Sequence, residues 1–421
     1  MREKTADETK APRRSGRKRR WPRVLAVLSA IAVFCVLALW FAIHRYDWMG
    51  PLVANTLRSI VGADAVAKLE DFVYSVEDRK NRLFRKNETP KAYWAVPSAP
   101  PRAAAPPPPP SASSGAAPSA PSAPELPPFR PRDPGPALKQ WSAKGDGIWV
   151  PIIDPRRPTE EPYLYKTLLH PDASRGWAEL FLVAVDLRRV DVHLVAGTQE
   201  PKPEGTNPTE RNPDGLPRLA RIPDAHHEEL LGAFNGGFMT EHGGYGFKLD
   251  GVVFVKPRPN ACTMALYHDR SMRIATWERI AADEPKMRWF RQAPECMYED
   301  GKIHPGLTAG SGLKWGATLD GDTVIRRSAV GLSEDRQILY VAITNHTTAR
   351  VLADGMRHAG AVDIAQMDVN WSYPKFVLYE PSGSPPVRKA VALASGFEFS
   401  EDEYIRNKSR RDFFYLMRRQ P

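Results

Sequence analysis

A stretch in the first third of the chain cannot take part in any folded core. Between residues 96 and 137 proline, alanine and serine dominate, with five consecutive prolines at 106–110. Such a composition buries almost no apolar surface and favours the extended polyproline II conformation, which acts as a semi-rigid spacer. We therefore expect a disordered linker that separates one folded domain from everything that precedes it.

The segment before the linker contains an uncharged run at residues 24–43, VLAVLSAIAVFCVLALWFAI. Twenty helical residues span about 30 Å, the thickness of a bilayer core. Residues 1–23 hold ten Lys/Arg against three acids, and this bias predicts a cytoplasmic N-terminus. A cleaved signal peptide would need a shorter apolar core and a cleavage site between small residues. The sequence predicts a basic cytoplasmic tail at 1–23, a transmembrane anchor at 24–43 and a periplasmic or extracellular main domain.

The net charge of +10 is concentrated at the N-terminus. Residues 1–23 contribute +7 (ten minus three), which leaves +3 for the rest of the chain. The basic block RRSGRKRR at 13–20 would suit nucleic acid in isolation. The excess positive charge lies directly before the uncharged run, where it would orient a membrane helix. We therefore expect a membrane partner through residues 24–43 and no nucleic-acid partner.

The sequence contains three cysteines, of which Cys35 lies inside the uncharged run. Cys262 and Cys296 lie in the part expected outside the cytoplasm, where an oxidising compartment favours a disulfide. The alternative is a pair of buried free thiols. No histidine stands at ligand spacing from either cysteine, so neither a metal site nor a cofactor is expected.

Strand-like apolar runs recur from residue 178 to residue 344, and a helix pattern runs from Thr347 or Thr348 to Gly360. This order predicts an α+β domain at 145–399: a mixed, largely antiparallel sheet with helices packed on it. Residues 44–95 read as a partly helical, membrane-proximal segment. The basic, aromatic tail at 400–421 either lies on a membrane surface or packs as a terminal helix.

Polar residues follow several of these apolar runs. The first group is Asn235 with Gly236 and Gly237, where the glycines permit positive φ or a close backbone approach. Arg327, in RRSAVG, is a candidate anion clamp, although an edge arginine in solvent is a common alternative. Asn345 and His346 stand at a helix start, which favours anions.

The last group lies in QMDVNWSYPKF, residues 366–376, between two apolar runs. This segment is either a turn without a functional role or part of a binding site. Its polar and aromatic residues are Asp368, Asn370, Trp371 and Ser372. Ligand groups in open mixed sheets gather at strand ends beside helix starts. The common position of the four groups therefore favours one shared site.

These segments together resemble the phosphodiester glycosidase domain family, over roughly residues 175–380. The family's Asn-Gly-Gly-Phe motif is matched by 235–238 and its Arg-Ser/Thr-Ala-Val/Ile-Gly motif by 327–331. Asp368 matches the family aspartate, but 369–372 replace a Gly-Gly-Gly-Ser run, and Asn345-His346 replaces Asp-Gly. Bulky Trp371 and Tyr373 in that place would stack on a sugar ring or fill the pocket.

The resemblance implies a hydrolase that cleaves a sugar–phosphodiester bond in an envelope glycan. Asp368 would act at the anomeric carbon as acid/base or nucleophile, while Arg327 and His346 would hold the phosphate. Asn235, Gly236, Gly237, Asn345, Asn370, Trp371 and Ser372 would bind substrate. Asp250 and Asp363 are candidates for a second carboxylate. The alternative is a non-catalytic module that binds glycan or an envelope partner on the same scaffold.

Overall fold

The structure is a computed structural model that describes residues 63–96, 126–203, 218–308, 315, 324–369, 372–383 and 387–420, with a few single residues between 27 and 38. The chain forms two compact units, Met1–Val66 and Ala67–Pro421, and only the second is described at length. Most of the run at 24–43 and of the linker at 96–137 lies outside the described residues. Where the chain is described, no helix has both the length and the apolar character needed to cross a bilayer.

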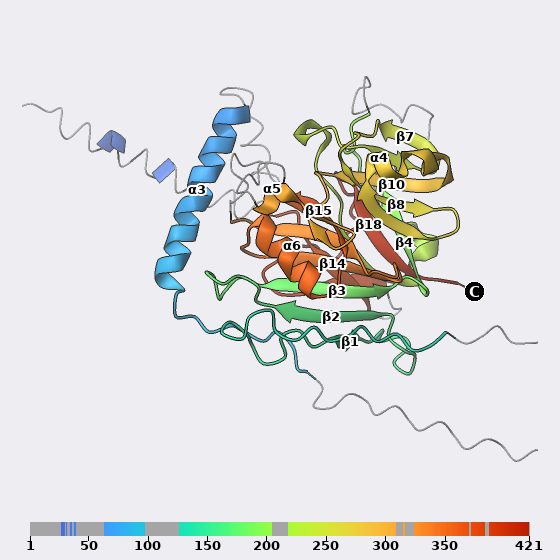
Figure 1. The fold of residues 1–421 in the computed structure, drawn as a ribbon, viewed down its shortest axis with the longest axis horizontal. Coiled ribbons are helices and arrows are strands. Elements are labelled where there is room, and N and C mark those ends of the chain that lie inside the picture. The colour runs from blue at the N-terminus through green and yellow to red at the C-terminus, as the bar shows by residue number, and fades with distance from the viewer. Residues whose placement is uncertain are drawn as a thin grey trace, which may run out of the picture. The chain divides into compact units, whose positions relative to one another are not determined.

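Three β-sheets dominate Ala67–Pro421 (Figure 1). The large sheet has the order β1 (Val150–Ile152), β2 (Leu164–Leu169), β3 (Leu180–Asp186), β14 (Ile338–Thr344), β13 (Arg327–Leu332), β15 (Asp363–Val369), β11 (Tyr298–Glu299) and β12 (Lys302–Ile303). A second sheet has the order β17 (Val387–Ala392), β16 (Phe376–Ser382), β5 (Leu230–Asn235), β18 (Phe413–Arg418) and β4 (Val190–Val195). The third has the order β7 (Val252–Val255), β6 (Phe247–Leu249), β10 (Met287–Ala293), β8 (Cys262–Tyr267) and β9 (Met272–Thr276).

Every ladder between these described strands is antiparallel. The expected fold class, a mixed, largely antiparallel sheet with helices packed on it behind a transmembrane helix, is wrong: the described strands form three antiparallel sheets, helices are few, and no described helix could cross a bilayer. Antiparallel neighbours need only short connections, whereas parallel pairs need long crossovers. The hairpin at residues 333–337 between β13 and β14 is one such short connection.

Helices are few in the described part. They are α3 (Ala63–Phe84), α4 (Trp277–Ile280), α5 (Pro305–Thr308) and α6 (Ala349–His358), with 3₁₀ turns at Asp224–His226, Thr240–His242 and Ala281–Lys286. Helix α6 lies over β3, β14, β13 and β15 (Figure 1). Its N-cap is Thr348, whose side chain accepts a hydrogen bond from Val351 N at 3.2 Å. The helix expected from the sequence is confirmed.

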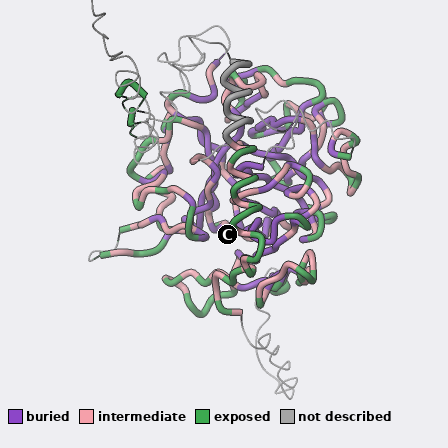
Figure 2. Tube along the Cα trace, turned by 90° about the vertical axis from the view of Figure 1, so that its left-hand side faces the viewer, coloured by how far each residue is buried: buried purple, intermediate pink, exposed green. Residues whose placement is uncertain are grey.

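The large sheet is the central layer because both of its faces are buried. On one face Phe181, Val183 and Val330 join the largest apolar cluster, which also holds residues of the other two sheets. On the other face Leu180 and Ala329 join α6 in a second cluster. Figure 2 shows the buried residues concentrated along the strands. The alternation of β3 and β13 between two apolar clusters fixes which side of the sheet each polar residue occupies.

The C-terminal segment is part of the domain. Residues 413–418 form β18, which pairs with β5 on one side and β4 on the other. Phe413 and Phe414 are completely buried. The expectation of a separate tail at 400–421, on a membrane or as a helix, is wrong for this segment, because its aromatic residues fill the centre of a sheet.

The close approach of α6 to the large sheet yields a stability prediction. A Cβ on Gly355 would lie 2.4 Å from Leu180 Cδ2. Gly355→Ala should lower the free energy of unfolding by about 1–2 kcal/mol, because overpacking exceeds the gain of about 1 kcal/mol in helix propensity. Denaturant unfolding measures it, with Arg357→Ala on the exposed face of α6 as a neutral control. A more stable Gly355→Ala protein would contradict this packing.

Candidate functional site

A hydrogen-bonded chain joins three segments that are distant in sequence. Asn235 Nδ2, at the end of β5, donates to Ser328 Oγ at 2.8 Å. Ser328 Oγ, on β13, donates to the backbone oxygen of Asp368 at 2.9 Å. All three residues are buried, at 1–2% exposure. Together with Tyr373 and Arg411 we call them the strand-end cluster.

A β-bulge directs the Asp368 side chain. Arg327 pairs with Val369 and Ala329 pairs with Gln366, so two steps along β13 oppose three steps along β15. Such a bulge changes the direction of the side chains that follow it. The Asp368 carboxylate consequently lies 2.6 Å from Arg411 Nη1, in the segment that leads into β18.

Burial dominates the electrostatics of this ion pair. Burial raises the pKa of Asp368, while the charge of Arg411 and its hydrogen bond oppose that rise. The Arg411 guanidinium stacks 3.9 Å from the Tyr373 ring and donates to Gly237 O at 2.8 Å. Burial also raises the pKa of Tyr373, so its hydroxyl stays protonated and donates to Asp412 O. The result is a buried carboxylate held close to the Arg411 guanidinium, whose Nε is itself buried without a hydrogen-bond partner.

The two glycines after Asn235 are required for space. A Cβ on Gly236 would lie 2.2 Å from Asp412 O, and one on Gly237 would lie 2.7 Å from Arg291 Cζ. Asp412 Oδ2 accepts a hydrogen bond from Gly237 N at 3.1 Å and pairs with Arg291 Nε at 2.8 Å. Neither glycine has positive φ. Of the two roles expected for this Gly-Gly pair, the close backbone approach is confirmed.

Arg327 does not face Asp368. Its side chain is completely buried and donates from Nε to Thr347 O at 3.1 Å and from Nη1 to Gln366 Oε1 at 3.0 Å, with a further bond to Trp315 O. It therefore leaves the sheet on the α6 face, whereas the Asp368 carboxylate meets Arg411 on the other face. The expectation that Arg327 and Asp368 act on one ligand is wrong.

The arginine on the Asp368 side is Arg326, one residue earlier. Alternation along the strand places Arg326 with Ser328 and Val330, which faces the largest apolar cluster. Arg326 Nη2 donates to Gly396 O at 2.7 Å, and its guanidinium lies 4.7 Å from the Phe397 ring. The alternation of side chains along a strand would have assigned Arg326 and Arg327 to opposite faces of the sheet, but the sequence does not show which face carries Asp368.

Asn345 and His346 belong to a second polar group, at the end of β14, on the same side of the large sheet's strand ends as Asp368. Asn345 Oδ1 accepts from Glu179 N at 2.9 Å, and Asn345 Nδ2 donates to Glu179 Oε2. Tyr93 OH also donates to Glu179 Oε2, at 2.9 Å. Burial raises the pKa of Glu179. Sequence reasoning missed this carboxylate because nothing around residue 179 resembles a motif.

His346 was expected to help hold a phosphate, and the structure gives the protonation state of its ring. Burial, with the nearby charges of Arg85 and Arg326, lowers the pKa of His346 to about 4. The imidazole is therefore neutral at pH 7. Because Arg327 donates to Thr347 and Gln366 on the α6 face, the structure does not bring Arg327 beside Asp368 to form the expected phosphate site with His346.

The remaining expected residues lie elsewhere or outside the description. Asn370 and Trp371 are outside the described residues, and Ser372 is half-buried just after them. Asp363 lies at the opposite end of β15 and accepts from Asp300 N at 2.8 Å. Asp250 lies in the exposed turn between β6 and β7, 3.4 Å from Arg288. Neither Asp250 nor Asp363 is a second carboxylate for Asp368.

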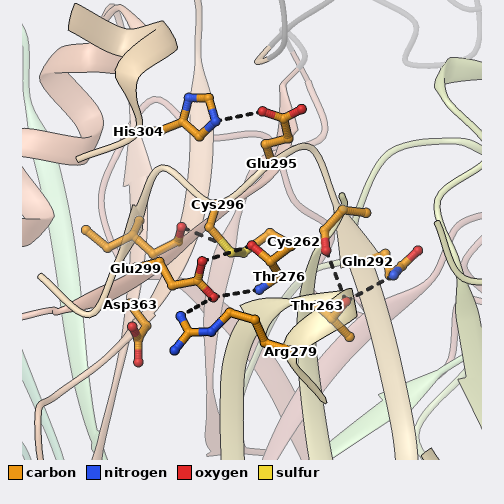
Figure 3. Close-up of a disulfide and its surroundings, with 12 residues drawn as sticks. Cys262, Thr263, Thr276, Arg279, Gln292, Glu295, Cys296, Glu299, His304 and Asp363 are labelled. Atoms are coloured by element: carbon orange, nitrogen blue, oxygen red, sulfur yellow. Dashed lines mark hydrogen bonds and ion pairs between the residues drawn. A yellow bond between two sulfur atoms is a disulfide. The ribbon is translucent and has the colours of Figure 1, made fainter. Parts of the chain in front are cut away.

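The disulfide between Cys262 and Cys296 is present, as expected, and closes a separation of 34 residues. Figure 3 shows it between two polar pairs: His304 with Glu295 at 2.7 Å, and Arg279 with Glu299 at 2.9 Å. A hollow of about 480 Å³ lies beside it, lined by Cys296 and these side chains. No residue of the strand-end cluster lines this hollow.

Comparison with known proteins gives only distant likenesses. No family model matches the chain, and no curated protein matches it. Among solved structures it is similar to the catalytic domain of zebrafish N-acetylglucosamine-1-phosphodiester alpha-N-acetylglucosaminidase auto-inhibited by its pro-peptide, at 15% identity and a TM-score of 0.37, over 62% of this chain and 85% of that one.

Two further solved structures match at 9% identity. A hypothetical protein from Synechocystis matches 62% of this chain and 65% of its own, with a TM-score of 0.37. A protein from Burkholderia pseudomallei described as exported matches 57% of this chain and 74% of its own, with a TM-score of 0.24. At such values these three likenesses indicate distant structural resemblance and carry no argument about activity.

The contacts of Arg327 predict a structural role. Arg327→Met would leave Trp315 O, Thr347 O and Gln366 Oε1 without this donor in a buried site. Thr347 O keeps a hydrogen bond from Ile325 N and Trp315 O keeps one from Gln366 Nε2, so Gln366 Oε1 is the acceptor that loses its donor. The free energy of unfolding should fall by about 1–3 kcal/mol, the cost of one unpaired buried acceptor. Denaturant unfolding measures it against Arg406→Met, an exposed arginine. Equal stability of the two variants would refute the structural role.

The neutral state of His346 predicts a pH effect on stability. Its folded pKa, about 4, lies below its ordinary value of 6.5. A lowered histidine pKa contributes stability that is present above pH 6.5 and is lost as the pH falls toward 4. His346→Gln should therefore flatten the loss between pH 6.5 and 4, by up to about 3 kcal/mol. Parallel stability–pH curves for the two proteins would exclude this contribution.

Proposed function

We propose that the domain is a hydrolase that cleaves the glycosidic bond of a sugar–phosphate diester. The observation that carries the proposal is the chain Asn235–Ser328–Asp368. It unites in space the three motifs that resemble the phosphodiester glycosidase family. Segments separated by 93 and 40 residues meet there through buried hydrogen bonds.

Asp368 is the group we assign to the anomeric carbon. Carboxylates serve glycosyl transfer as nucleophile or as acid and base, and burial raises the pKa of this one toward the working range. Arg411, at 2.6 Å, fixes its orientation. A phosphate leaving group needs less protonation than an alkoxide, so a single carboxylate suffices. Asp368 accepts a proton from water as the water oxygen bonds to the anomeric carbon, and the bond from that carbon to the phosphate oxygen breaks, so the phosphate departs with the electron pair.

We assign the phosphate to Arg326, in place of Arg327. Arg326 extends toward the same side of the sheet as the Asp368 carboxylate, and a planar guanidinium matches phosphate oxygens. Glu179 lies three strands from β15, about 14 Å at ordinary strand spacing. That separation exceeds the carboxylate spacing of glycosidases, about 5–9.5 Å. Glu179 and Asn345 are therefore assigned to substrate hydroxyls.

The disulfide supports a further part of the proposal. Disulfides persist in oxidising compartments, and Cys262–Cys296 is buried at 0% and 4% exposure. We place the domain in such a compartment, where an envelope glycan would be its substrate.

One observation favours a second function, a glycan-binding module without catalysis. Asp368 is only 2% exposed, and it lines neither the hollow beside the disulfide nor the one between β4 and the β8–β9 turn. A carboxylate that no ligand reaches serves structure alone. The two functions differ in a measurable way, because only the hydrolase releases free sugar.

The test is release of free sugar from a panel of nucleotide sugars and sugar-1-phosphodiesters by the full chain. Asp368→Asn should lower kcat about 10²–10⁴-fold, the usual contribution of a positioned carboxyl. The acidic limb of the pH–rate profile should lie above the ordinary Asp value of about 4, because burial raises the pKa of Asp368. Asp224→Asn, at an exposed aspartate, is the matched control.

Two outcomes are decisive for the assignment. Turnover in Asp368→Asn equal to that of Asp224→Asn would remove Asp368 from the chemistry. Glycan binding without any sugar release, retained in Asp368→Asn and Arg326→Met alike, would establish the binding module instead.

A further inference from the structure

A second large hollow lies where two of the sheets meet, away from the strand-end cluster. It has a volume of about 490 Å³ and is lined by β4, the β6–β7 turn, the β8–β9 turn and the start of β10. β4 is the edge strand of its sheet, and Figure 1 shows it beside β8. All of its lining residues are described, and none has been given a role in the proposed hydrolysis.

Two arginines and two aspartates line this hollow, and only Arg419, which pairs with Asp191 from outside the lining, brings the count to one cation in excess. Arg288 lies 3.4 Å from Asp250, and Asp191 pairs with Arg419 at 2.9 Å. Arg270 lines the same hollow and has no ion-pair partner among the described residues. Its backbone φ of +68° places it in a turn between β8 and β9. An exposed guanidinium at the mouth of a hollow suits an anion.

A buried imidazole in the wall of the hollow has an unused nitrogen. His193 stacks on Tyr415 with ring centroids 4.6 Å apart and planes at 9°. His226 Nδ1 lies 2.6 Å from Tyr415 OH and fixes that ring in turn. His193 Nε2 is buried without a hydrogen-bond partner. Orphaned buried polar atoms are rare in proteins and usually mark the place of a water or ligand.

We propose that this hollow binds a phosphate group carried on a small polar molecule. The guanidinium groups of Arg270 and Arg288 hold the phosphate oxygens, and the His193 ring, once protonated, places a positive charge beside the anion. The size, about 490 Å³, accommodates a monosaccharide-sized carrier. The proposal stands on this hollow alone and does not depend on the proposed hydrolysis.

Binding should take up a proton at His193. Burial first, then Arg288 and His226, lower the pKa of His193 to about 4, and Asp191 opposes them. The other titratable or charged groups of this region are Tyr415, Asp250, Tyr267, His268 and Arg270. An anion in the hollow favours the protonated ring. Anion affinity should therefore rise as the pH falls, with His193 neutral in the empty protein.

The test is calorimetric titration of the full chain with inorganic phosphate and, separately, with inorganic sulfate. Sulfate is included because its own charge is constant between pH 5 and 8. We expect saturable binding to one site for both anions. Arg270→Ala and Arg288→Ala should each raise Kd at least about tenfold, as expected for loss of a charge-assisted contact. Sulfate should bind more tightly at pH 5 than at pH 8, and His193→Gln should abolish that difference while keeping the affinity at pH 8.

The control is Arg406→Ala. Arg406 lies 3.6 Å from Asp402 at the surface, much as Arg288 lies 3.4 Å from Asp250. It should leave Kd unchanged within twofold, although it removes the same charge. Absence of saturable binding, or equal weakening by Arg406→Ala and Arg288→Ala, would mean an adventitious ion only and would overturn the proposal.

Discussion

Two consecutive residues, Arg411 and Asp412, connect all three sheets. They precede β18 in the sheet that contains β5, and Arg411 reaches Asp368 of the large sheet at 2.6 Å. Asp412 pairs with Arg291 of β10 in the third sheet at 2.8 Å. The backbone of Gly236 and Gly237 is hydrogen-bonded to the same two residues.

Ion pairs in such a place do little for net stability. Withdrawing the charges from water costs several kcal/mol per ion, and their attraction only roughly repays it. Loss of one partner, by contrast, leaves a buried charge unpaired at a cost of about 3–5 kcal/mol. The pairs therefore specify how the sheets meet more than how firmly they hold. The Gly-Gly pair follows from this geometry, because side chains there would occupy the space of Asp412 and Arg291.

Local features of the sequence predicted local features of the structure. The helix cap at Thr348 and the apolar stripe of α6 depend only on residues a few positions apart, and the sequence predicted both. The disulfide followed from compartment and from the number of available cysteines. Strand pairing was harder: Phe413 lies opposite Asn235 across 178 positions of sequence. The aromatic run of β18 fits a strand or a helix equally until β5 and β4 are placed beside it.

The choice between Arg326 and Arg327 shows the same limit within the site. Adjacent strand residues face opposite sides, so an error of one position exchanges the Asp368 side of the sheet for the α6 side. The sequence shows neither the bulge on β15 nor which apolar cluster receives Ala329 and which receives Val330. The resemblance to a family motif favoured Arg327, which the structure uses to join β13 to the backbone at Trp315 and Thr347.

Arg326 and Arg327 thus make different contacts on opposite faces of the sheet at the start of β13. Arg327 neutralises buried acceptors under α6 and keeps the end of β13 in place, while Arg326 extends from that fixed end toward the side of Asp368. A ligand-binding guanidinium needs such a rigid base, since its affinity depends on how little ordering it must undergo on binding. On this view Arg327, at 0% exposure, is a positioning residue for Arg326, at 8% exposure, and under the proposed function the matched motif would mark the support of the site.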